Sequence, residues 1–269
     1  MPKTVIILGM HRSGTSLVAQ YIHKLGVNLG DHLLGKHASN EDGHFEDVDF
    51  LNFHRKVLTN RNLGDFLIDD DISLVFDSSE FDKAKKLVES KNDLRKHWGW
   101  KDPRTCLFIN NWNKIISDSV YIIPYRDPSI VINSVIRREL NNIKEEGKTS
   151  FYRFILSIKN RILFHFNRYK LIDKISKTWL IYNNKILAVI KDRPFYLFNI
   201  DSVLDRDNDI FSFLKNHGFR VEYFPLESIY KKKLLKQNID KTLLLKNKFL
   251  RKQCQDVFIK LNEISELNN

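Results

Sequence analysis

Four short apolar stretches are spaced along the chain, and each is followed by segments whose apolar residues recur at helical spacing. The first stretch, at residues 5–8, is apolar throughout. An unbroken apolar run of this length is typical of a strand that is buried on both faces of a parallel sheet. The predicted strands are residues 5–8, 98–101, 120–125 and 194–200.

The segments between these strands predict helices, and glycine or proline marks several of their ends. The predicted helices are residues 15–25, 47–60, 81–96, a helix that Pro103 could open, 128–140, 151–168, 174–191, a helix that ends at 218, and a basic tail from 230, with a polar linker at 141–150. Strands that alternate with helices favour the α/β class. We therefore expect one domain over residues 1–269 with a three-layer α/β/α fold, and the Gly9–Ser16 loop makes the expected fold P-loop-like. Its central parallel sheet should have about four to five strands, with an added helical segment at 141–191.

The loop between the first strand and the first helix has the glycine spacing of a phosphate-binding loop. Gly9 ends the apolar run, and Gly14-Thr15-Ser16 follows after four residues. This is the spacing of a Walker A loop in which Thr15 replaces the lysine that reaches the β- and γ-phosphates. The cation stands upstream instead, at Arg12.

This loop suits an anion that carries less charge than a triphosphate. Arg12, the backbone amides of residues 13–16, and the hydroxyls of Ser13, Thr15 and Ser16 are the groups that could hold it. The competing interpretation is a glycine-containing turn that any α/β protein could have. The complete motif between a buried strand and an amphipathic helix favours the anion site.

Two further motifs follow the second and third strands. Trp100-Lys101-Asp102-Pro103-Arg104 closes the second strand, and Arg126 follows the third strand, with Ser134 eight residues later. Together with the loop at residues 9–17, these motifs resemble the sulfotransferases that use 3′-phosphoadenosine-5′-phosphosulfate (PAPS). The resemblance is closest to the tyrosylprotein and bacterial carbohydrate branches, and it covers residues 4–140 most firmly.

The resemblance implies a role for each of these motifs in donor binding. Arg12, Ser13, Gly14, Thr15 and Ser16 would bind the 5′-phosphosulfate of PAPS. A second set would hold its 3′-phosphate, and this set is Arg126 and Ser134, with Arg137 or Arg138 assisting. PAPS would be the co-substrate, adenosine 3′,5′-bisphosphate the product, and no metal would take part.

The resemblance also implies catalytic roles for Arg12, Lys101 and Glu46. Arg12 would offset charge on the leaving oxygen, and Lys101 would stabilise the sulfuryl or bridging oxygen. Glu46 would take the proton of the acceptor hydroxyl, with His44 as the reserve base. The alternatives are a solvated lysine and an ordinary loop acid. Asp47 and Asp127 are better explained as helix caps.

The acceptor is not encoded by any of these motifs. We expect a hydroxyl of a saccharide, with residues 141–191 as a segment that binds it; a tyrosine, a lipid or a small phenol is the alternative. A kinase or NTPase is a rival that would need a magnesium ligand, for which Asp102 and Asp127 are weak candidates. A non-catalytic binding module is a third possibility.

The net charge of +11 changes this picture little. It predicts a cationic face for anionic ligands or a solvated basic surface, and no nucleic-acid motif accompanies it. The two cysteines, Cys106 and Cys254, have no metal-binding spacing. No leader or membrane-spanning stretch is evident, so we expect a cytoplasmic protein; the oligomeric state stays open.

Overall fold

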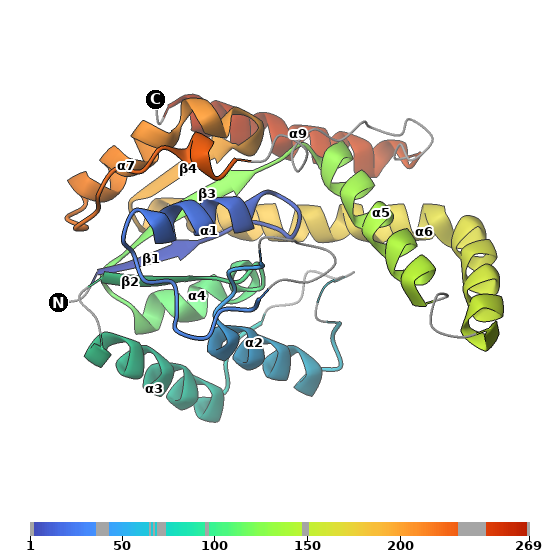
Figure 1. The fold of residues 1–269 in the computed structure, drawn as a ribbon, viewed down its shortest axis with the longest axis horizontal. Helices are drawn as coiled ribbons and strands as arrows, with labels where there is room; N and C mark the ends of the chain where they lie inside the picture. The colour runs from blue at the N-terminus through green and yellow to red at the C-terminus, as the bar shows by residue number, and fades with distance from the viewer. Residues whose placement is uncertain are drawn as a thin grey trace.

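Four parallel strands form the centre of the computed structural model, which describes residues 3–35, 43–64, 66, 68, 74–94, 97–146, 151–230 and 246–267. The strands are β1 (Lys3–Ile7), β2 (His97–Lys101), β3 (Ser119–Tyr125) and β4 (Phe195–Asn199), in the order β2-β1-β3-β4 (Figure 1). Each lies within a few residues of a strand that the apolar pattern predicts. The predicted parallel α/β fold is confirmed, with four strands among the described residues.

Helices cover both faces of this sheet, as the three-layer prediction requires. They are α1 (Thr15–Lys24), α2 (Val48–Asn60), α3 (Ser78–Leu94), α4 (Thr105–Ile115), α5 (Pro128–Glu146), α6 (Phe151–Val189), α7 (Asp207–Asn216) and α9 (Lys248–Glu266). One apolar cluster joins α1 and α7 to one face of the sheet. The other cluster joins the opposite face to α2, α3, α4, α5, α6 and α9. None of the described helices combines the length and hydropathy needed to cross a membrane.

The connections that follow β1 and β3 lead to opposite faces of the sheet. The strands are neighbours in the sheet, yet α1 packs on one face and α5 on the other. A parallel sheet opens a crevice at the carboxyl ends of its strands where successive connections diverge in this way. The fold therefore places its ligand-binding edge beside the ends of β1 and β3.

Glycine is required where the loop enters α1. Gly14 occupies the N-cap position with a φ of 82°, a left-handed conformation that side chains disfavour. A Cβ atom there would lie 2.2 Å from Cγ1 of Ile200, which follows β4. Gly14 thus lets the loop after β1 pack directly against the residue that follows β4, two strands away in the sheet.

The predicted linker and helix pair at 141–191 are wrong in detail. Residues 141–146 continue α5, because this polar stretch contains no residue that stops a helix, while 147–150 lie outside the described residues. The two predicted helices form one 39-residue helix, α6, since no glycine or proline separates them. The first part of α6 and the end of α5 extend beyond the sheet (Figure 1).

Two other predicted boundaries also differ. The helix predicted to end at 218 is α7, which begins only at Asp207, because a 3₁₀ segment, Ile200–Asp205, comes first and is capped by Asn199. Much of the basic tail lies outside the described residues, at 231–245, and its remainder forms α9.

Candidate functional site

Three cations follow the three neighbouring strands β1, β2 and β3. Lys101 is the last residue of β2, Arg126 follows β3 directly, and Arg12 lies in the loop after β1. Because parallel strands end at a common edge of the sheet, these side chains belong to one rim, as the sequence predicts. Lys101 and Arg126 are each only 2% exposed, so both charges are held within the fold.

On the β3 side of the rim, Arg12 contacts Ser134. The Arg12 Nε donates a 2.8 Å hydrogen bond to the Ser134 Oγ, which lies in the second turn of α5. Asp127 caps that helix, because its Oδ1 accepts a hydrogen bond from the Ser129 amide. The Nη2 of Arg126 lies 3.2 Å from Oδ1 of Asp201. The structure thus brings together the residues predicted for two separate phosphate sites.

Arg12 lies in a field of like charges. Burial, followed by the charges of Arg138 and Arg126, lowers the pKa of Arg12 to about 10. Arg138 stands one helical turn after Ser134 on the same face of α5, and its guanidinium lies 4.1 Å from the ring centroid of Phe66. Of the two arginines left open by the sequence, Arg138 contributes to the lowered pKa of Arg12. A cluster of three arginines is stabilised by an anion.

The loop at residues 9–16 supplies neutral donors beside this cluster. Ser13 and Thr15 are buried, and the Ser13 amide donates to the Met10 carbonyl to close the turn. Thr15 and Ser16 open α1, where the first backbone amides of a helix have no intrahelical acceptor. The Ser16 Oγ donates to the His44 carbonyl, so this hydroxyl also ties the loop to the segment that carries Glu46.

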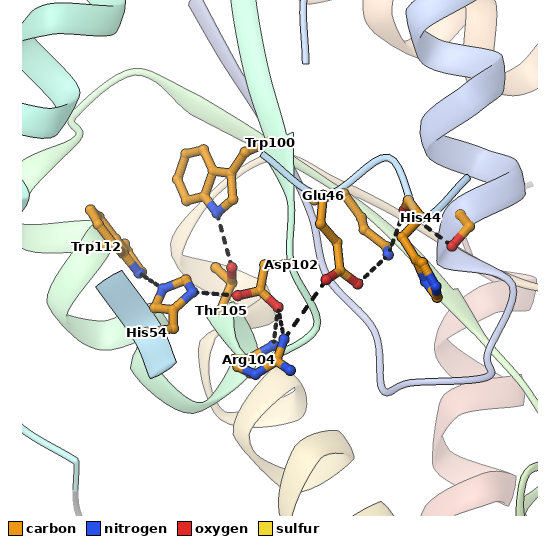
Figure 2. Close-up of polar contacts among 10 residues, drawn as sticks. His44, Glu46, His54, Trp100, Asp102, Arg104, Thr105 and Trp112 are labelled. Atoms are coloured by element: carbon orange, nitrogen blue, oxygen red, sulfur yellow. Dashed lines mark hydrogen bonds and ion pairs between the residues drawn. The ribbon is translucent and has the colours of Figure 1, made fainter. Parts of the chain in front are cut away.

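On the β2 side of the rim, Lys101 and Glu46 form a buried ion pair. The Lys101 Nζ lies 2.8 Å from the Glu46 Oε1 and also donates to the His44 carbonyl at 2.9 Å (Figure 2). The side chains are 2% and 7% exposed. The structure thus brings together Lys101 and Glu46, the predicted catalytic pair. His44, the reserve candidate for the base, contacts Lys101 through its backbone carbonyl.

A second carboxylate, Asp102, anchors the next cation along the chain. The Asp102 Oδ1 accepts a 2.7 Å hydrogen bond from the Arg104 Nη1, which also lies 3.9 Å from the Glu46 Oε2 (Figure 2). The Asp102 Oδ2 lies 2.7 Å from the His54 Nδ1. Burial alone would raise the pKa of Asp102, but the charge of Arg104 and the His54 hydrogen bond outweigh it and hold that pKa well below its usual range.

The protonation of His54 follows from its two neighbours. The Trp112 Nε1, which can only donate, lies 3.0 Å from the His54 Nε2, so that nitrogen must accept. The proton of the neutral ring is then on Nδ1, where it is donated to Asp102. The role of His54 was not predicted from the sequence, because His54 occupies a position in the apolar face of α2. It lies on the helix face that buries Phe50 and Leu51.

The two carboxylates that a kinase could use as magnesium ligands make other contacts in the structure. Asp102 is paired with Arg104 and His54, and Asp127 caps α5. Asp47 caps α2, as predicted, because its Oδ1 accepts from the Asp49 amide. Within the described ranges, no three His, Cys, Asp or Glu side chains cluster as metal ligands would.

Comparisons with known proteins find a likeness in structure but none in sequence. No protein-family model and no curated protein sequence matches the chain. Among solved structures, the chain is similar to the sulfotransferase domain from the Synechococcus PCC 7002 olefin synthase. The identity is 14%, the TM-score is 0.48, and the match covers 97% of this chain and 95% of that chain. At this identity and score the likeness carries no weight in the function argued below, which rests on the residues themselves.

Proposed function

We propose that the protein is a sulfotransferase that moves a sulfuryl group from PAPS to a hydroxyl acceptor. The observation that carries this proposal is the hydrogen bond between Arg12 and Ser134. It joins the loop after β1, which suits a 5′-phosphosulfate, to the second turn of α5, which with Arg126 suits a 3′-phosphate. A nucleotide with anionic groups on both the 5′ and the 3′ positions of its ribose would fit these two neighbouring sites.

The charges around the rim support a donor of this kind. Arg126 and Arg12 carry guanidinium groups, which bind phosphate through two parallel hydrogen bonds, and Ser134 adds a hydroxyl. The amides and hydroxyls of residues 13–16 lie at the start of α1, where the helix dipole favours an anion. Thr15 stands where a triphosphate-binding loop carries lysine, which argues against a nucleoside triphosphate.

The chemistry assigned to the β2 side is proton removal and charge stabilisation. Glu46 takes the proton of the acceptor hydroxyl while the new O–S bond forms and the S–O bond to the 5′-phosphate breaks. Lys101 and Arg12 stabilise the charge on the sulfuryl group and on the leaving phosphate oxygen. The electron pair of the broken bond leaves with adenosine 3′,5′-bisphosphate.

We further propose a saccharide as the acceptor, with a tyrosine or small phenol as the alternative. The end of α5 and the first part of α6 extend from the sheet beside this rim and would contact the acceptor (Figure 1). A kinase is the rival of another class. Two observations argue against a kinase. The loop has Thr15 in place of lysine, and both candidate magnesium ligands, Asp102 and Asp127, already make hydrogen bonds within the protein.

The direct test is transfer of ³⁵S from labelled PAPS to a panel of saccharides, tyrosyl peptides and phenols. We expect transfer to at least one hydroxyl compound, undiminished by EDTA, because none of the proposed roles needs a metal. Phosphoryl transfer from ATP that appears only with added magnesium would contradict the proposal and favour the kinase. Sulfation confined to tyrosyl peptides or phenols would keep the reaction and replace the saccharide.

A further inference from the structure

His11, which stands immediately before Arg12 in the loop, carries a buried ring nitrogen that lacks a partner. Its Nε2 is shielded from solvent and has no hydrogen-bond partner among the described residues. A buried polar atom left in this way is energetically unfavourable, and most such atoms in native proteins are paired. The atom is therefore a candidate for contact with a ligand that binds at the rim.

The surroundings of His11 indicate the charge of that ligand. Burial, followed by the charge of Arg104, holds the pKa of His11 well below its usual value; Arg138 and Lys101 act in the same sense, and Asp102 opposes them. The ring is thus neutral near pH 7. Three cations and one carboxylate around a neutral nitrogen favour an anionic partner.

The elements packed around His11 place it between the two sides of the rim. The charges that act on its pKa come from two sides: Lys101, Asp102 and Arg104 lie at or just after the end of β2, and Arg138 lies on α5. The ring packs edge-on to Phe66, with centroids 4.7 Å apart, and lies 6.2 Å from the ring of Tyr182 on α6. Its neighbour Arg12 turns instead to Ser134 on the β3 side.

We propose that the His11 Nε2–H donates a hydrogen bond to the sulfonate of bound PAPS. This inference rests on the proposed function. In it His11 binds the sulfonate, which is the group that is transferred, while Arg12, Arg126 and Ser134 hold the phosphates. A sulfonate only accepts hydrogen bonds, so the neutral ring must carry its proton on Nε2. The bond persists as the sulfuryl group passes to the acceptor, because the donor stays neutral and fixed by Phe66 and Tyr182.

The test compares the affinities of two ligands that differ only by the sulfonate. Calorimetry on the full chain with PAPS and with adenosine 3′,5′-bisphosphate isolates that group, and it needs no acceptor. A hydrogen bond to an ionic group is worth about 1.5–3 kcal/mol, so His11→Asn should weaken PAPS binding about 10- to 100-fold. The affinity for the bisphosphate should not change.

A matched variant keeps the donor. The amide nitrogen of glutamine reaches about as far as Nε2, whereas that of asparagine reaches only about as far as Nδ1. His11→Gln should therefore retain most of the PAPS affinity that His11→Asn loses. Ser134→Ala is the opposite control, because it should weaken both ligands by the same factor. Equal weakening of both ligands in His11→Asn, or no weakening of either, would overturn the inference.

Nuclear magnetic resonance of the unaltered protein gives an independent readout. In ¹⁵N-histidine-labelled protein, His11 should be the neutral Nε2–H tautomer, and its signal should move with PAPS more than with the bisphosphate. The Nδ1–H tautomer would overturn the inference even if the substituted proteins fail to fold. If the bisphosphate binds no better than AMP, the proposed function itself fails; if it binds well and the His11 results are negative, only this inference fails.

Discussion

The two sides of the loop after β1 hold their charges in different ways. On the β2 side, the carboxylates are buried: Glu46 pairs with Lys101, and Asp102 pairs with Arg104, with side-chain exposures of 7% and 0% for the acids. On the β3 side, the carboxylates beside Arg126 and Arg138 are Asp201 and Glu139, which are 41% and 37% exposed. The cations of the first side are neutralised within the fold, and those of the second lie against solvated acids.

From this difference we expect the β2 side to hold its groups in fixed positions and the β3 side to bind the anionic donor. Buried carboxylates fix Lys101 and Arg104 in place before any ligand arrives, which suits groups that must be positioned accurately for chemistry. Arg12, by contrast, lies close to Arg126 and Arg138, and their mutual repulsion is relieved by an incoming anion. The β3 side should therefore govern affinity for the donor, and the β2 side should govern turnover and stability.

The largest expected effect is on turnover, from a change on the β2 side. Glu46→Gln is nearly isosteric and removes the proposed base, so the rate of sulfuryl transfer should fall about 10²–10⁴-fold. Nucleotide affinity should be unchanged, because the phosphates are assigned to the β3 side. Single-turnover kinetics measure the first quantity and calorimetry the second.

The control is Glu227→Gln, which changes an exposed acid in the 3₁₀ segment Leu226–Ser228 and should leave both quantities unchanged. A Glu46→Gln protein that turns over normally, beside an inactive His44→Ala protein, would transfer the role of base to His44.

A smaller effect on stability should distinguish the two sides. Asp102→Asn removes the buried carboxylate charge that Arg104 and His54 contact most closely, so the free energy of unfolding should fall by about 3–5 kcal/mol. Asp201→Asn removes a half-exposed partner of Arg126 and should cost less than about 1 kcal/mol. Urea denaturation measures both, and equal losses would contradict the comparison.

The effect of Asp102→Asn should also depend on pH, with a predictable sign. The pKa of Asp102 is held well below its usual value in the folded protein. Its contribution is therefore complete above the ordinary carboxyl pKa of about 3.9 and is lost as the pH falls below that value. The difference in stability between the unaltered protein and Asp102→Asn should shrink below about pH 4.

The strands and the rim were predictable because their signals are local. Short stretches rich in apolar residues identify all four strands, and a cation at the end of β2 and another directly after β3 place Lys101 and Arg126 at one edge. Motif spacing paired Ser134 with Arg126 and assigned Arg12 to a separate phosphate site, and the hydrogen bond between Arg12 and Ser134 was not predicted. Their roles in binding and catalysis stay predictions.

The remaining features depend on contacts between distant segments. His54 lies 48 residues before Asp102 and occupies a position in the buried face of α2, so periodicity assigns it to the core. The surroundings of His11 come from β2, α5 and α6, which no local motif reveals. The continuity of α6 was also missed: two helices were predicted on either side of residues 168–174, although this stretch contains no glycine or proline that would end a helix.

The central claim is that the β3 side forms a dedicated pocket for a 3′-phosphate, and one measurement tests it most directly. Calorimetry should show that adenosine 3′,5′-bisphosphate binds far more tightly than AMP, which lacks only the 3′-phosphate. Arg126→Ala should remove about 2–5 kcal/mol from the binding free energy of the bisphosphate, the scale for loss of a buried charge partner, and little from that of AMP. Equal affinities of the unaltered protein for the two nucleotides would contradict the claim.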